Sequence, residues 1–222
     1  MSRPPIDLDG LLSREPPGDG AALERVLAAS RGELALRRPV RRWRTQAAWV
    51  IAASGGLSLL VAAVMLATGA ARAPMLLGRV PLLGLLLVTS AVCAWGALSP
   101  RGRWLRRTGL GLALASAVAL VLARGTPAAV STLPGWVCAA SHFAVGCVPL
   151  VVALVALRAA AFEPLRALVA GLAVGTTGAF LGELACEQDW RHVAVWHLLA
   201  WTCIAAAALA ISRSLKPRSY AP

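Results

Sequence analysis

Six long apolar runs separated by short polar loops constrain this chain more than any other feature of its sequence. They lie near residues 47–69, 80–98, 105–123, 136–157, 165–185 and 193–211. Most of them approach the roughly 20 residues with which an α-helix crosses about 30 Å of hydrocarbon. Backbone polar groups find no water inside a bilayer, so a crossing segment of this length must be helical. The sequence therefore predicts an all-α, polytopic membrane bundle of about six transmembrane helices.

The composition agrees with a membrane protein. Of the 222 residues, 58% are hydrophobic and 14% are charged, whereas soluble domains are nearer one half and one quarter. The first apolar run starts only near Ala47, after a long polar stretch, so we expect a permanent helix and not a cleaved signal peptide. The third run begins beside Arg106 and Arg107, whose long side chains can reach the membrane surface.

Basic residues indicate the orientation of the predicted helices. If the N-terminus is inside, the outer loops carry four basic residues, Arg72, Arg79, Arg124 and Arg191, and the inner segments carry fourteen. Cytoplasmic loops are enriched in Arg and Lys, so both ends should lie in the cytoplasm. The net charge of +12 could suggest nucleic acid, but the arginines flank the apolar runs. We therefore expect lipid contact and no direct nucleic-acid binding.

We expect the chain to divide into a cytoplasmic N-terminal segment (1–45), a six-helix transmembrane domain (46–212) and a cytoplasmic tail (213–222). The first segment is too short for an independent core, and its proline- and glycine-rich start should be irregular. An amphipathic helix is expected near 20–36. The apolar residues that could bind a protein partner are Leu11, Leu12, Leu23, Val26, Leu27 and Leu34. A helix lying on the membrane surface and a disordered segment are the alternatives.

The fifth apolar run carries glycines on one helical face, at 171, 175, 178 and 182. Small residues at this spacing let helices approach closely in lipid, so this helix should be central in the bundle. Glu183 is the one acidic residue well inside an apolar run. An intramembrane carboxylate suggests a function, although a structural hydrogen-bonding role explains it equally well.

The predicted outer side concentrates reactive side chains, and we take six of them as candidate sensing residues: Cys138, His142, Glu183, Cys186, His192 and His197. Three interpretations compete. The six residues could be ordinary core and interface residues, they could form an oxidation- or signal-sensing cluster, or they could be metal ligands. The spacing of Cys186, His192 and His197 matches no metal motif, so no metal and no cofactor is assigned. Trp, His and Cys are also the side chains that singlet oxygen attacks most readily.

Catalytic motifs are absent from the sequence. There is no G-x-S-x-G, no H-E-x-x-H and no P-loop, and the loops between the predicted helices are too short to hold a soluble catalytic domain. We therefore do not expect an enzyme.

Short motifs in the C-terminal half carry a resemblance to a known family. They are Gly146-Cys147-Val148-Pro149, Glu163-Pro164-Leu165-Arg166, Cys186-Glu187-Gln188-Asp189 and Val193-Ala194-Val195-Trp196-His197. Their order resembles the six-helix negative regulators of extracytoplasmic-function sigma factors, of the NrsF type. Arg38-Pro39-Val40-Arg41-Arg42, before the first run, is also similar. The proline that usually follows the loop cysteine is missing after Cys186, and Ala185 replaces the histidine that often precedes it.

The resemblance implies a membrane-bound anti-sigma factor. Its cytoplasmic N-terminal segment would hold an extracytoplasmic-function sigma factor, and its membrane domain would sense a stress signal and release that partner. Within the family the chain is most similar to light-responsive regulators of carotenoid genes, for which the signal would be light or singlet oxygen. The alternatives are a metal or redox sensor with a different cytoplasmic partner, or a small transporter.

Overall fold

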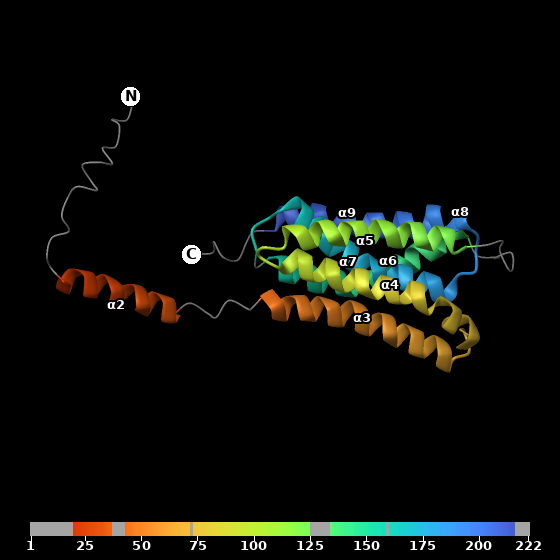
Figure 1. Cartoon of the computed structure of the whole chain (residues 1–222), viewed down its shortest axis with the longest axis horizontal. Coiled ribbons are helices and arrows are strands. Elements are labelled where there is room, and N and C mark those ends of the chain that lie inside the picture. The colour runs from red at the N-terminus through yellow and green to blue at the C-terminus, as the bar shows by residue number, and fades with distance from the viewer. Residues whose placement is uncertain (1–19, 37–42, 72, 125–133, 159, 216–222) are drawn as a thin grey trace, which may run out of the picture. The chain divides into compact units, whose positions relative to one another are not determined.

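The structure is a computed structural model that describes residues 20–36, 43–71, 73–124, 134–158 and 160–215 (Figure 1). It separates into two compact units, Met1–Val40 and Arg41–Pro222. In the first unit a helix, α2, spans Gly20–Leu36, the range over which the sequence predicts one. Val26 and Leu27 are exposed on it, by 63% and 45%. The surroundings of the Leu23 and Leu34 side chains are not described, and Leu11 and Leu12 lie outside the described residues.

The second unit is a helix bundle. Its first five long helices are α3 (Trp43–Ala67), α4 (Ala73–Leu98), α5 (Arg103–Leu122), α6 (Gly135–Leu157) and α7 (Pro164–Ala185). The last long helix, Trp190–Ser214, consists of α8 (Trp190–His192), a π-helical turn η1 (Val193–His197) and α9 (Leu198–Ser214). Six of these helices are long and apolar enough to cross a membrane, and the described residues form no strand. The predicted all-α membrane bundle is confirmed, so the chain is a multi-pass membrane protein.

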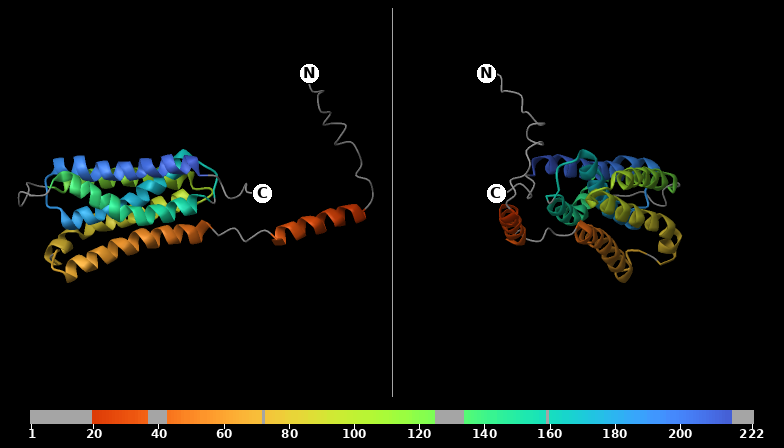
Figure 2. Two further views of the ribbon diagram at one scale, coloured as in Figure 1. Left: turned by 180° about the vertical axis from the view of Figure 1, so that it is seen from behind. Right: turned by 60° about the vertical axis from the view of Figure 1, so that its left-hand side comes forward.

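Helix α7 is the centre of the bundle, as its glycines predict. In its most apolar 18-residue stretch 83% of the residues are buried, compared with 22–33% in the other spans. Helix α7 contacts α3, α4, α5, α6 and α9 (Figure 2). A Cβ on Gly171 would lie 2.6 Å from the Cα atom of Ala205 in α9. At Gly175 it would overlap the indole of Trp201, whose Nε1 donates a hydrogen bond to the Leu172 carbonyl at 2.9 Å. The glycines thus let α9 lie directly against α7.

The outer surface of the bundle is apolar. On α3, for example, Leu59, Leu60 and Val64 are each more than half exposed. In water such a surface would be a large exposed hydrophobic patch, whereas in a bilayer it is the face that contacts lipid. Lipid tails are as apolar as leucine, so the hydrophobic effect does not drive helices together inside a bilayer. The helices associate through close packing of small residues and through hydrogen bonds. The buried hydroxyls of Thr89 in α4 and Ser116 in α5 provide one such bond, at 2.8 Å.

We expected the Arg106 side chain to extend to the membrane surface, but in the structure it packs inside the protein. Its side chain is buried, and Nη1 donates to the carbonyls of Gly96 and Ser99 at 3.3 Å each. Its Nε lies 3.3 Å from Oε1 of Glu163. These acceptors compensate the guanidinium for lost water, which makes burial possible. Arg107 is exposed, as expected.

Candidate functional site

The candidate sensing residues meet at one end of the bundle, which we call the outer end because the charge pattern places it outside. It comprises the first turns of α6, the last turn of α7 and the first turns of the Trp190–Ser214 helix. Chain reversal between α7 and α8 occurs over Cys186–Asp189, where Oδ1 of Asp189 accepts the backbone N–H of His192 at 3.0 Å. This is an N-cap, which fixes the direction in which the last helix starts.

The π-helical turn determines where the two histidines of this helix lie. In an α-helix, residues five apart are separated by about 140° around the axis. In η1 the Leu198 N–H bonds to the Val193 carbonyl, five residues earlier, and this wider turn brings residues five apart close to the same side. The rings of His192 and His197 accordingly lie 5.3 Å apart, centroid to centroid.

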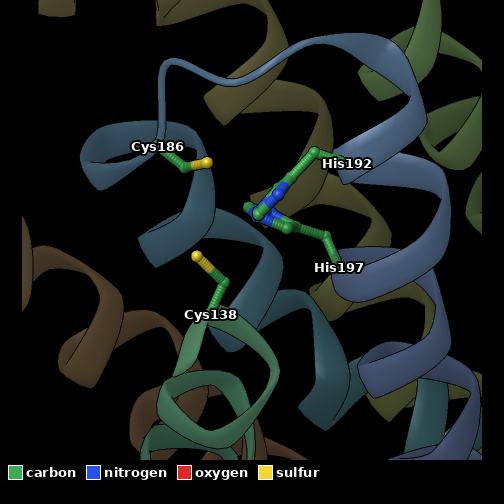
Figure 3. A group of neighbouring side chains, drawn as sticks. All are labelled: Cys138, Cys186, His192 and His197. Carbon is green, nitrogen blue, oxygen red and sulfur yellow. The ribbon is translucent and has the colours of Figure 1, made fainter. Parts of the chain in front are cut away.

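Two cysteines face these histidines, and we call the four residues the Cys/His cluster: Cys138, Cys186, His192 and His197. A sulfur or ring nitrogen of each lies within 4.8 Å of one on each of the other three. Cys138 comes from the first turn of α6 and Cys186 from the end of α7, and the Cys186 sulfur points toward the imidazoles, with the Cys138 sulfur close by (Figure 3). Both thiols are free. Three helices therefore bring soft sulfur and nitrogen donors to one point.

His142 extends the cluster into the bundle. Its ring packs edge-on against that of His197, with centroids 4.5 Å apart, and its side chain is only 1% exposed. Gly182 of α7 makes room for this pair, because a Cβ there would lie 2.6 Å from Nε2 of His142 and would also overlap the His197 ring.

Glu183 lies in a buried ion-pair group that we call the Glu183 triad, with Arg79 of α4 and Arg124, the second residue after α5. Arg124 Nη2 is 2.7 Å from Glu183 Oε2, and Arg79 Nε is 3.4 Å from Oε1. Arg79 also donates to the Glu183 backbone carbonyl. The side chains of Glu183 and Arg124 are 3% and 5% exposed, so their charges compensate each other away from water.

Arg124 joins the triad to the Cys/His cluster. Its Nη1 donates a hydrogen bond to the carbonyl of Cys186, while Nη2 holds the Glu183 carboxylate. One guanidinium thus ties the end of α5 to both the last turn of α7 and the loop that positions Cys186.

The structure brings all six candidate sensing residues to the outer end: four form the Cys/His cluster, His142 packs against His197, and Glu183 is joined to the cluster through Arg124. Sequence reasoning missed Arg79 and Arg124, which it counted as loop charges. Their partner is 104 and 59 residues away in the chain, so no local pattern indicates the pairing. The meeting of Cys138 with Cys186 was missed for the same reason.

These features define the class: a six-helix membrane protein with a glycine-lined central helix and a polar, cysteine- and histidine-containing outer end. The chain is 69% identical over 220 residues to the carotenogenesis protein CarR of Myxococcus xanthus. The match covers 99% of this chain and 100% of the relative. The chain therefore belongs to the CarR family. No protein-family profile and no solved structure matches it.

Proposed function

We propose that this chain is an anti-sigma factor that controls carotenoid genes from the bacterial inner membrane. It holds an extracytoplasmic-function sigma factor with its cytoplasmic N-terminal segment, and light or singlet oxygen inactivates it and frees the sigma factor. The observation that carries the proposal is the 69% identity, over nearly the whole chain, to a protein named for carotenogenesis. The resemblance to six-helix negative regulators supplies the mechanism.

The N-terminal helix supports partner binding. Val26 and Leu27 are adjacent, apolar and exposed on α2, and an amphipathic helix of this kind commonly binds by laying its apolar face into a groove of its partner. The acidic Glu24 and Glu33 accompany Arg25 and Arg31 in the same helix. Helices that lie on membranes usually have a mainly basic polar face, so this balance favours a protein partner over a lipid surface.

The outer end supports sensing. It concentrates two thiols and three imidazoles, and Trp136 and Trp190 are exposed beside them at the starts of α6 and α8. Singlet oxygen reacts with all three side-chain types. Oxidation here would disturb the contacts among α6, α7 and the last helix, and α7 extends from this end to the other end of the bundle. A signal received outside could thereby reach the cytoplasmic end.

The transporter alternative has less support. A cavity lined by Leu157, Arg166 and Ser212 at the opposite end of the bundle has a volume of about 10 Å³, enough for one water molecule. The middle of α7 is packed with small residues of its own, among them Ala173 and Val174, both fully buried. We therefore favour a regulatory binding protein over a transporter.

A reporter assay tests the proposal. Each extracytoplasmic-function sigma factor of the same genome is expressed in a heterologous bacterium with its cognate promoter, with and without the full-length chain. One sigma factor should be silenced in the dark, and the double variant Val26→Asn, Leu27→Asn should restore its activity. The matched control is Ala28→Asn, Ala29→Asn, which changes the other side of the same helix and should still silence.

Repression of no sigma factor by the full-length chain would contradict the proposal. So would equal repression by both double variants at equal membrane levels, because the apolar stripe would then have no part in binding.

A further inference from the structure

The Cys/His cluster has the composition and the arrangement of a metal centre, and we propose that Cys138, Cys186, His192 and His197 bind one zinc-type divalent cation. This inference does not depend on the proposed anti-sigma function. It rests on where the fold brings the four side chains, since their order in the chain matches no metal motif.

The donor set fits zinc. Two cysteines and two histidines form one of the common structural zinc sites, with Zn–S near 2.3 Å and Zn–N near 2.0–2.1 Å. In a tetrahedron with those bond lengths the donor atoms are about 3.3–3.8 Å apart. Here they lie within 4.8 Å of one another, so movements of about 1 Å, of the size that side-chain rotation gives, would close the site.

Unpaired ring nitrogens indicate that a ligand is needed. The Nε2 atoms of His192 and His197 and both ring nitrogens of His142 are buried without a hydrogen-bond partner among the described residues. Leaving such a buried polar atom without a partner costs free energy of folding. A cation held by one nitrogen of His192 and one of His197 removes part of this cost, and it also explains why two cysteines face two imidazoles.

Charge balance also favours the site. A divalent cation replaces the protons of both thiols, so two protons leave and the complex of one cation with two thiolates has no net charge. A neutral complex can remain buried, unlike an isolated ion. Arg124, whose guanidinium donates to the Cys186 carbonyl, is paired with Glu183 at 2.7 Å, which offsets part of its repulsion of the cation.

The surrounding residues hold the donors in place. Arg124 donates to the Cys186 carbonyl, the Asp189 side chain caps the helix that carries His192, and the π turn directs His197 to the same side. Such outer-shell contacts orient metal ligands, and losing one typically lowers metal affinity about 10- to 100-fold. The cation would fasten α6, the end of α7 and the start of the last helix to one another.

Cobalt(II) binding to the full-length protein in detergent tests the proposal. With reductant present, one equivalent should give the intense visible bands of tetrahedral cobalt and a near-ultraviolet thiolate charge-transfer band, and zinc should displace it. Cys186→Ser or His192→Ala should lower the affinity by more than the 100-fold upper value for an outer-shell loss. Cys147→Ser and Cys203→Ser, whose native side chains are exposed toward lipid, are the matched controls and should bind as the wild type does.

A second measurement needs no variant and so does not depend on variants that fold. X-ray absorption of the zinc-loaded wild-type protein should show two sulfur and two nitrogen neighbours. The proposal is overturned by an absence of stoichiometric binding, by a shell of oxygen and nitrogen only, or by unchanged affinity in the ligand variants. It is also overturned if Cys138 and Cys186 are joined by a disulfide in protein isolated directly from membranes.

Discussion

Breaking the Glu183 triad should destabilise the bundle more than breaking any exposed ion pair. In Glu183→Gln the Arg124 guanidinium, 5% exposed, keeps its charge and loses the carboxylate 2.7 Å away. Removing one partner of a buried pair costs about 3–5 kcal/mol. Arg79 adds little to this, because its side chain is 22% exposed and can regain water. We therefore expect Glu183→Gln to lower the free energy of unfolding by about 3–5 kcal/mol.

A double-mutant cycle with Arg124→Gln measures the coupling. In the double variant neither position carries a charge, so no charge is left without its partner. Its loss of unfolding free energy should therefore be smaller than the sum of the two single losses, by about 1–3 kcal/mol. Arg166→Gln is the control, because it leaves Glu163, whose side chain is 38% exposed, still paired with Arg106 at 3.3 Å and strands no buried charge. Its loss should be about 1 kcal/mol or less.

Unfolding of the purified protein in mixed micelles with increasing denaturing detergent, followed by circular dichroism, gives these free energies. Two results would refute the reasoning: a Glu183→Gln variant within 1 kcal/mol of the wild type, or single losses that simply add. Either would mean that water or lipid headgroups reach Arg124 and replace its partner.

Three further predictions concern packing, orientation and the signal. Gly171→Ala should lower the free energy of unfolding by about 1–3 kcal/mol, because the new methyl group meets the α9 backbone. Gly84→Ala should be neutral or slightly stabilising, because nothing lies within 4 Å of the added Cβ. The same unfolding assay compares the two variants. A fluorescent protein fused after Pro222 should fluoresce, and alkaline phosphatase fused there should be inactive, if the C-terminus is cytoplasmic. Illumination of membranes with a singlet-oxygen sensitiser should oxidise Trp136, Trp190 or the Cys/His cluster before Trp201, as peptide mass spectrometry would show, since Trp201 is buried in the bundle.

Much of the fold could be predicted from hydropathy alone. Each span must be helical and about 20 residues long, so the six runs predict six helices, and the glycine face of α7 predicts its central position. The helix ends were harder to predict: α3 begins at Trp43, earlier than the apolar run at 47, because polar interfacial residues continue a helix after the hydrocarbon ends.

The candidate site was predictable only as a set of residue types near one end. Cys138 and His142 on α6 meet Cys186 and His197 through helix packing, which apolar sequence does not encode in any local pattern. The π turn has no signal in Val193–His197, yet it determines where His197 lies. Arg106 could not be placed from the sequence for a similar reason. An arginine next to an apolar run indicates the orientation of the helix, but it does not show whether the side chain faces lipid or packs inside the protein.

The most direct test of the central claim is a binding measurement on the intact protein. Full-length chain in lipid nanodiscs is titrated with the sigma factor that it silences, in the dark and after exposure to singlet oxygen. We predict a one-to-one complex in the dark, weakened at least tenfold by Val26→Asn, Leu27→Asn and lost after exposure. Failure of the intact dark protein to bind any extracytoplasmic-function sigma factor of its genome would contradict the account.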